Sequence, residues 1–345
     1  MQKDEAIKKI VNEQAMKKII FGRTMSSSSM AHYAMTMLNE EIEKNESIRS
    51  TAIALSTYMP MKWALENKIV YSLTYDHGVS DISLMMDVNN LMQRFLGNEP
   101  DKKLIDVSYI GKQHEYVKEV HELIDRSLLM LQKNPPMFGG LSLYRCINTI
   151  HIDPQAGIID DVSRYTVRNY YLKAVREISD LYGKKMDYYF SRALYTPKTY
   201  LQENDDKYHN TELLMTAYIK LLSRFTHDES LYRRVLRCKT VEELAAYDTY
   251  VYADYEHAEQ ILQYMIYIRT AIETVKKFPI DGQMYYDILI GELDAKVQGK
   301  MLRTLLKSLH ITQASYYRLR REAYDVLSMV LWGYSTRNML GVLQK

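Results

Sequence analysis

Cysteine, glycine and proline are all scarce in this chain, and each scarcity excludes a class of structure. The two cysteines, Cys146 and Cys238, stand far apart in the sequence. They form neither a disulfide framework nor a CxxC-type zinc site, and we expect two reduced, buried thiols. With 13 glycines and 7 prolines among 345 residues, long helices are favoured over a turn-rich sheet.

Long apolar runs and nucleotide-binding motifs are also missing. No window approaches about 18 consecutive apolar residues, so the sequence predicts no transmembrane helix. The segment that ends at Phe21 is amphipathic and lacks the apolar centre of a secretory signal, and we therefore expect a cytoplasmic protein. The motifs GxxxxGK[ST], GxGxxG and GxSxG do not occur, so the sequence does not predict an enzyme.

Apolar residues recur with the period of an α-helix through most of the chain. Hydrophobic residues make up 47% of the sequence, which is enough for a sizeable core. The exception is the β-branched run 147–153, which could be a short strand or a helix end before Pro154. The sequence therefore predicts an all-α protein. Its clearest one-sided stripes are Leu172, Val175, Ile178, Tyr182, Met186 and Tyr189, and Ile261, Met265, Ile268, Ile272 and Val275.

Proline and glycine punctuate the helical pattern at a few places. The segments 134–140, 195–198 and 278–282 each carry residues that end a helix. We predict a helical region over 1–133 and a long-helix region over 141–278, which could form one multi-helix body with the first. A C-terminal helix-turn-helix module is predicted over 280–345.

Several groups of polar residues could carry chemistry but also have simpler interpretations. His114, His121 and Asp125 share one helix face, yet Lys118 stands between them and would repel a metal ion. Asp254 and His257 form only half of a carboxylate-bridged dimetal motif. We expect no metal and no cofactor.

Two further groups lie near loops or acidic stretches. The residues around Pro154 could form an acid–base site, although acids that precede a helix usually cap it; they are His151, Asp153, Asp160 and Asp161. A tyrosine group could stack on single-stranded nucleic acid, but its acidic flanks oppose a polyanion and favour core or interface; it comprises Tyr247, Tyr250, Tyr252 and Tyr255.

Charge is distributed unevenly along a nearly neutral chain. The formal net charge is +2, and residues 241–259 are strongly acidic. Residues 295–321 are the reverse, because they contain no Asp or Glu. A basic end on a neutral molecule is compatible with local contact to DNA. The basic residues of this run are Lys296, Lys300, Arg303, Lys307, Arg318, Arg320 and Arg321.

The basic run has the form of two helices joined at His310-Ile311. A supporting helix is predicted over about 296–308, and Thr312 can cap the second helix. We expect Leu302, Leu305 and Leu309 of the first helix to pack against the apolar stripe of the second. That stripe is Tyr316, Leu319, Ala323, Val326 and Val330.

Residues outside this stripe are candidates for contact with double-stranded DNA. Gln313 and Ala314 are placed early in the second helix, where a recognition helix meets base edges. Arg318 and Arg321 could pair with guanine or hold phosphates, and Tyr317 could contact a phosphate or a thymine methyl. Three basic residues would contact the DNA backbone, namely Lys300, Arg303 and Lys307.

The segment 280–335 resembles the sigma-factor region-4-like domain of phage-type regulators of the ArpU kind. The resemblance rests on ITQASYYRLRREA at 311–323, on the Leu-Trp-Gly ending at 331–333, and on a first helix like that at 281–289. It implies DNA binding and a role in transcription or mobile-element regulation, with the same groove-facing residues. The chain departs from the pattern at the turn residue His310, at Leu306, where the family has a small residue, and in the order of the hydroxyl residues Thr312 and Ser315.

Two hypotheses of function follow. In the first, the chain is a DNA-binding protein whose helical body supplies dimerisation, partner contact or effector sensing. In the second, it is a helical protein-interaction scaffold, host-defence or phage-related, and the helix-turn-helix packs on a protein partner.

Overall fold

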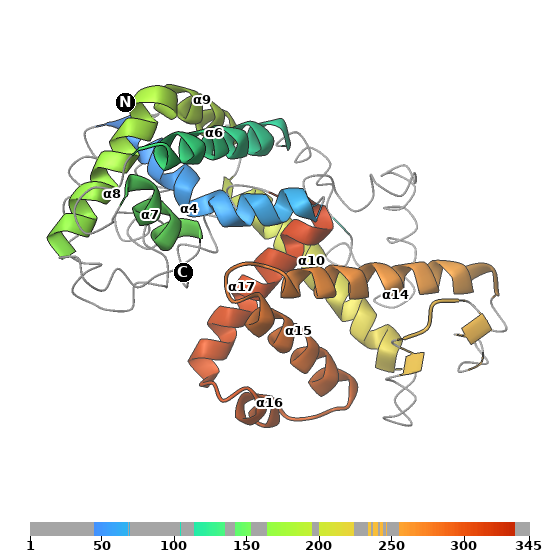
Figure 1. The fold of residues 1–345 in the computed structure, drawn as a ribbon. Helices are drawn as coiled ribbons and strands as arrows, with labels where there is room; N and C mark the ends of the chain where they lie inside the picture. Colours follow the sequence, from blue (N-terminus) through green and yellow to red (C-terminus); the bar gives the residue numbers. More distant parts are fainter. Residues whose placement is uncertain are drawn as a thin grey trace. The chain divides into compact units, whose positions relative to one another are not determined.

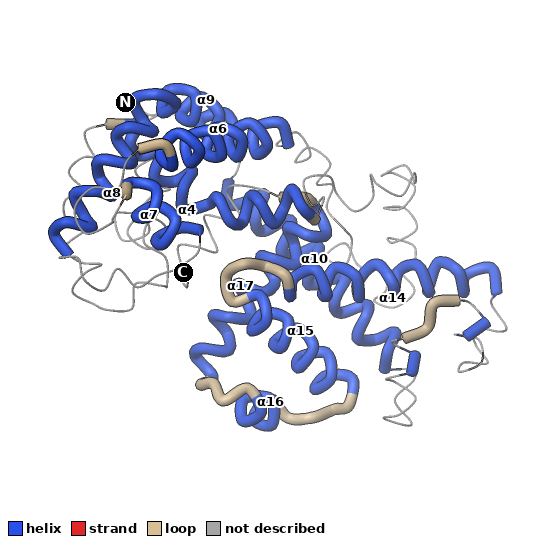
Figure 2. Tube along the Cα trace, in the orientation of Figure 1, coloured by secondary structure: helices blue, strands red, loops and turns tan. Residues whose placement is uncertain are grey.

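The computed structural model describes the helical parts of the chain. They are residues 45–67, 69, 104, 114–134, 142–152, 164–194, 200–223, 234–235, 237–240, 242–243, 246 and 255–334. These residues form helices, turns and loops, and none of them lies in a strand (Figure 2). The predicted all-α fold is therefore confirmed for this part of the chain.

The chain divides into two compact units, each built from separate stretches of sequence. Unit 1 comprises Met1–Glu66, Lys112–Lys198 and Ser335–Lys345, and unit 2 comprises Asn67–Gly111 and Thr199–Tyr334. The boundary expected at 278–280 lies inside unit 2. The reason is that the helix before it packs along two of the helices after it, so the C-terminal segment shares a core with residues 200–276.

In unit 1, one apolar helix is packed against most of the others. This helix, α4 (Glu46–Glu66), contacts α6 (His114–Gln132), α8 (Arg164–Ile178) and α9 (Lys184–Leu194) (Figure 1). It also contacts two π-helical turns, η4 (Asn148–Ile152) after α7 (Leu143–Ile147) and η5 (Ser179–Gly183) between α8 and α9. Residues 147–152 are thus helical, and the strand alternative for them is wrong.

In unit 2, long helices surround the C-terminal helix. They are α10 (Tyr200–Leu222), α14 (Tyr255–Lys276), α15 (Gly282–Val297) and α17 (Gln313–Trp332), with the short α16 (Leu302–Ser308) between the last two. Helix α17 packs against α10, α14 and α15. Every residue from Glu322 to Trp332 is buried, so the C-terminal half of α17 forms the centre of unit 2.

The predicted stripes and thiols are confirmed. Ile261, Met265, Ile268, Ile272 and Val275 are all buried in α14. Leu172, Val175, Ile178 and Met186 are buried in unit 1, while Tyr182 and Tyr189 are half-buried. Cys146 and Cys238 are free and buried, and burial raises the pKa of the Cys146 thiol to about 12. Among the described helices, none is both long and apolar enough to cross a membrane.

A histidine in unit 1 is held in its neutral form. His151 lies in η4, and its Nε2 atom is 3.0 Å from the hydroxyl of Tyr171. Burial lowers the pKa of His151 to about 3. Asp153, Asp160 and Asp161, which the sequence groups with His151, lie outside the described residues.

We expect His151 to make the stability of the fold dependent on pH. In the unfolded chain the pKa of a histidine is about 6.5, so the unfolded state binds a proton before the folded state does as the pH falls. The neutral His151 side chain stabilises the folded state fully above about pH 6.5. This contribution to the free energy of unfolding is lost as the pH falls towards the folded-state pKa, by up to about 1.4 kcal/mol per pH unit. The free energy of unfolding by urea, measured between about pH 7 and pH 5, should fall less steeply in His151→Gln. An unchanged slope in that variant would contradict the assignment.

Candidate nucleic-acid interface

Two turns of the same kind shape the segment from α15 to α17. The first follows Val297 and contains Gly299 at a φ of 65°. Lys300 N–H donates to the carbonyl of Ala295 at 2.8 Å, and Gly299 N–H donates to that of Lys296 at 3.4 Å. These bonds form a Schellman turn, which ends a helix because the left-handed residue turns the chain away from its axis.

The first turn corrects the predicted supporting helix. That helix was expected over about 296–308, but α16 begins only at Leu302, and Lys296 belongs to α15. Gly299 is the residue that could have indicated the break, because glycine is the usual residue just after a helix end.

The second turn joins α16 to α17 at the predicted place. Ile311 N–H donates to the carbonyl of Leu306 at 3.2 Å, and His310 N–H donates to that of Lys307 at 3.3 Å. His310 takes a φ of 52°, which is uncommon for a residue with a side chain. Thr312 then caps α17, because its hydroxyl oxygen accepts the backbone N–H of Ser315 at 3.1 Å. The predicted cap is confirmed.

Helix α16 rests mainly on α15. Leu305 is the buried residue of α16, and a Cβ atom on Gly291 of α15 would collide with its Cδ1 atom. Leu302 and Leu309, which were expected to pack with Leu305 on the stripe of α17, are only half-buried. The absence of a side chain at Gly291 thus allows α16 to lie close to α15.

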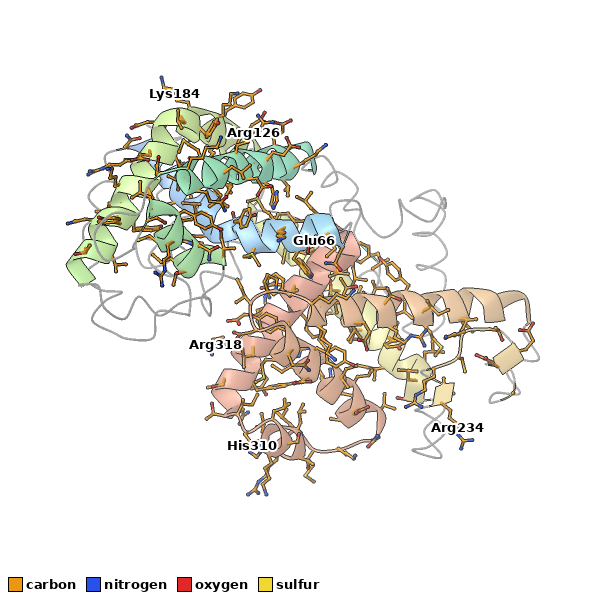
Figure 3. The ribbon with its side chains drawn as sticks, in the orientation of Figure 1. Glu66, Arg126, Lys184, Arg234, His310 and Arg318 are labelled. Atoms are coloured by element: carbon orange, nitrogen blue, oxygen red, sulfur yellow. The ribbon has the colours of Figure 1, made fainter. Side chains whose placement is uncertain are left out.

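Seven of the eight candidate DNA-contact residues are exposed at one end of unit 2. Gln313, Ala314, Tyr317 and Arg318 lie on the first two turns of α17. Three cations precede them, and we call all seven the basic tip: Lys300 in the turn before α16, and Arg303 and Lys307 on α16. Figure 3 shows His310 at the turn between the two helices and Arg318 on the outside of α17.

The cations of the basic tip are not neutralised by the part of the chain that the structure describes. Within that part, Lys300, Arg303, Lys307 and Arg318 form no ion pair. Four positive charges therefore lie on one surface without a carboxylate partner in the described ranges, which is the electrostatic character of a phosphate-binding surface.

Arg321 differs from the other seven candidate residues. Its Nε atom lies 3.5 Å from Oδ1 of Asp325, and its guanidinium carbon lies 3.7 Å from the centroid of the Tyr208 ring. The residue is half-buried between α17 and α10. Its charge is thus already used to hold α17, whereas the charge of Arg318 is not.

An ionic network around the buried carboxylate of Glu292 fixes α17 below the basic tip. Arg320 Nε donates to Glu292 Oε2 of α15 at 2.8 Å, and its Nη1 donates to Tyr208 at 3.2 Å and to Glu212 at 3.3 Å, both on α10. Lys296 Nζ lies 2.6 Å from the other oxygen of Glu292, whose side chain is 4% exposed. Burial opposes the charge of Arg320, but the hydrogen bond to Glu292 and the electrostatic effect of Tyr324, Glu292 and Tyr208 together outweigh it and raise the pKa of the guanidinium. We call these residues the Arg320 network.

Sequence reasoning did not find the Arg320 network. Its only local indication is the pair Glu292 and Lys296, spaced four residues apart on one helix. Glu212 is 108 positions from Arg320, and no spacing rule connects residues at that separation. The stripe of α17, in contrast, was predictable, and Tyr316, Leu319, Ala323, Val326 and Val330 are all buried.

The other polar candidates have structural roles where they are described. His121 Nδ1 lies 3.2 Å from Asp125 Oδ2, and Tyr58 both donates to Asp125 at 2.7 Å and stacks on the His121 ring. The described residues contain no group of three His, Cys, Asp or Glu side chains that could hold a metal ion. The Asp254–His257 pair and the tyrosine group at 247–255 lie where side chains are not described.

Removal of Arg320 is expected to destabilise unit 2. In Arg320→Met the buried carboxylate of Glu292 loses one of its two cations and keeps Lys296. Because the charge stays partly compensated, the loss should be below the cost of an unpaired buried charge, at about 1–3 kcal/mol. Urea denaturation should show this loss, and the double variant Glu292→Gln/Arg320→Met should recover part of it. The matched control is Lys277→Met, an exposed cation of the same unit. Equal stabilities of Arg320→Met and Lys277→Met would contradict the role of the network.

Comparisons with known proteins assign no family to this chain. The chain matches no protein-family model, no curated protein and no solved structure. The interpretation of the basic tip therefore rests on its residues and their contacts.

Proposed function

We propose that this chain is a cytoplasmic DNA-binding protein that uses the α16–turn–α17 segment as a helix-turn-helix. The observation that carries the proposal is the basic tip. Four cations from a turn and two helices, which have no ion pair among the described residues, surround the exposed first turns of a helix whose other half is buried. A helix held in this way can enter the major groove while the flanking cations contact phosphates.

Each residue of the basic tip has a role in this proposal. Gln313 and Ala314 would meet base edges, because they are exposed at the start of α17. Arg318 would pair with a guanine or a phosphate, and Tyr317 would contact a phosphate or a thymine methyl. Lys300, Arg303 and Lys307 would contact the DNA backbone.

Arg321 has a smaller part in the proposal than Arg318. To reach a phosphate it would have to leave Asp325 and the Tyr208 ring, and the new contact would be offset by the loss of the old ones. We therefore assign Arg321 chiefly to the support of α17.

The resemblance of residues 280–335 to phage-type regulators supports a role in transcription or mobile-element regulation. In that segment α15 begins at Gly282, and α17 follows the Thr312 cap. On this proposal the body of the protein is not an enzyme, and it supplies dimerisation, partner contact or effector sensing.

The proposal is tested by the binding of the full-length protein to mixed genomic duplex fragments at low and moderate salt. We expect selective retention that weakens as salt rises, because bound cations release counterions from the DNA. Arg318→Ala should weaken binding by about 1–3 kcal/mol if it reads a base, and should reduce the salt slope by about 1 if it holds a phosphate. Lys277→Ala, which removes an exposed charge of unit 2 outside the tip, should change neither quantity.

Failure of the test would favour protein binding instead. Met301 and Tyr317 are exposed large apolar side chains at the same tip, and such groups also fill protein interfaces. No retention of duplex at either salt would contradict DNA binding. The tip would then be assigned to a protein partner, as in a helical interaction scaffold.

A further inference from the structure

A second surface with cations and exposed apolar side chains lies on unit 1, where α6 runs beside the continuous helix α8–η5–α9. Two hydrogen bonds fix the alignment of these helices. Asn134 Nδ2, just after α6, donates to Glu177 Oε2 of α8 at 3.3 Å, and Tyr189 of α9 donates to Glu119 Oε2 of α6 at 3.4 Å. The helices are therefore antiparallel, and the C-terminal half of α6 lies beside η5 and the start of α9.

Large apolar side chains are exposed on both helices of this pair. Leu129 of α6 is 58% exposed, Leu181 of η5 is 55% exposed and Tyr188 of α9 is 48% exposed. A single exposed leucine is ordinary, but three exposed large apolar side chains on two neighbouring helices favour an interaction site.

The π-helical turn is the reason that Leu181 is exposed. In a regular α-helix Leu181 would follow the buried Ile178 by three residues and turn towards the core. The wider turn instead places Ser179 and Gly183 against α4, where a Cβ atom on Gly183 would lie 2.7 Å from Ser47 Cβ. Single π-helical turns within α-helices are frequently found at functional sites.

Cations surround these apolar side chains. Lys184 and Lys185 are exposed, and they form no ion pair within the described residues. Arg126 of α6 is exposed and lies 3.5 Å from Glu122, a carboxylate that it shares with Lys118. Asp180 is an exposed acid beside them. Figure 3 places Arg126 on α6 and Lys184 at the start of α9, both on the outer surface of unit 1.

We propose that this outer face of α6 and α9, formed by Arg126, Leu129, Leu181, Lys184, Lys185 and Tyr188, binds an acidic protein segment that carries apolar side chains. Charge complementarity selects the occupant. The lysines attract carboxylates, and the leucines and Tyr188 require apolar side chains on the same partner. This inference is independent of DNA binding by unit 2.

A nucleic acid fits the outer face less well than an acidic peptide does. Glu122 and Asp180 would repel phosphates, and aliphatic side chains such as Leu129 and Leu181 offer no stacking surface for bases. An amphipathic acidic helix presents both of the required kinds of side chain in one stripe.

The test uses the full-length protein and a labelled synthetic peptide with leucines at helical spacing and glutamates between them. A scrambled peptide of the same composition and phosphatidylserine vesicles serve as the other probes. By fluorescence anisotropy, the amphipathic peptide should bind more tightly than the scrambled one. The double variant Lys184→Glu/Lys185→Glu should weaken this binding by more than about tenfold, because like charges then face each other. Leu181→Ser should weaken it through the loss of apolar contact.

The matched control is Lys62→Glu, which reverses a partly exposed lysine of α4 in the same unit, outside the proposed face, and should leave peptide binding unchanged. Leu181, Lys184 and Lys185 are exposed and the Lys62 side chain is 45% exposed, so the circular dichroism of each variant should equal that of the wild type. The proposal is overturned if the scrambled peptide binds equally well, if neither peptide binds, or if Lys62→Glu weakens binding as much as the double variant. Vesicle binding that depends on Lys184 and Lys185, without peptide binding, would instead identify a lipid surface.

Discussion

The position of α17 depends on the ion pair between Arg320 and the buried Glu292. This pair joins α17 to α15, and the second nitrogen of Arg320 joins it to α10 through Tyr208 and Glu212. A buried charge is costly unless it is paired, so the geometry of these three helices is tightly constrained around it. The buried half of α17 and the exposed half meet at this point. Because the Arg320 network holds α17 in the core of unit 2, the exposed first turns of α17 also have a fixed direction.

The basic run of the sequence serves two purposes that its composition does not distinguish. Three of its cations form ion pairs with carboxylates of unit 2 and hold the helices together, namely Lys296, Arg320 and Arg321. Lys300, Arg303, Lys307 and Arg318 are exposed and form no ion pair with the residues that the structure describes. On the proposed function this division separates stability from binding, because the residues that anchor the recognition helix are not those that contact the DNA. The outer face of α6 and α9 is a separate surface, because it lies on unit 1.

Local rules predicted the parts of the fold that depend on neighbours in the sequence. The stripes of α14 and α17, the Thr312 cap and the turn at His310 each involve residues within one or two helical turns of one another. The break at Gly299 was missed, although glycine after a helix end is itself a local indication. The π-turn at η5 was also missed, because it arises where α4 approaches Gly183, and no periodicity in α8 or α9 records that approach.

The sequence by itself determined that this protein is all-α, where several of its helices begin and end, and which residues could form a basic surface. Helical period and capping suffice for these conclusions because they act over a few residues. Only the tertiary structure decided which cations of the basic run are exposed and which are held by other side chains of unit 2. Arg318 and Arg321 are equivalent in the sequence pattern, yet Tyr208 of α10 covers one and not the other. The tertiary structure also decided that the C-terminal segment shares a core with α10 and α14, since packing between distant helices is what completes the burial of α17.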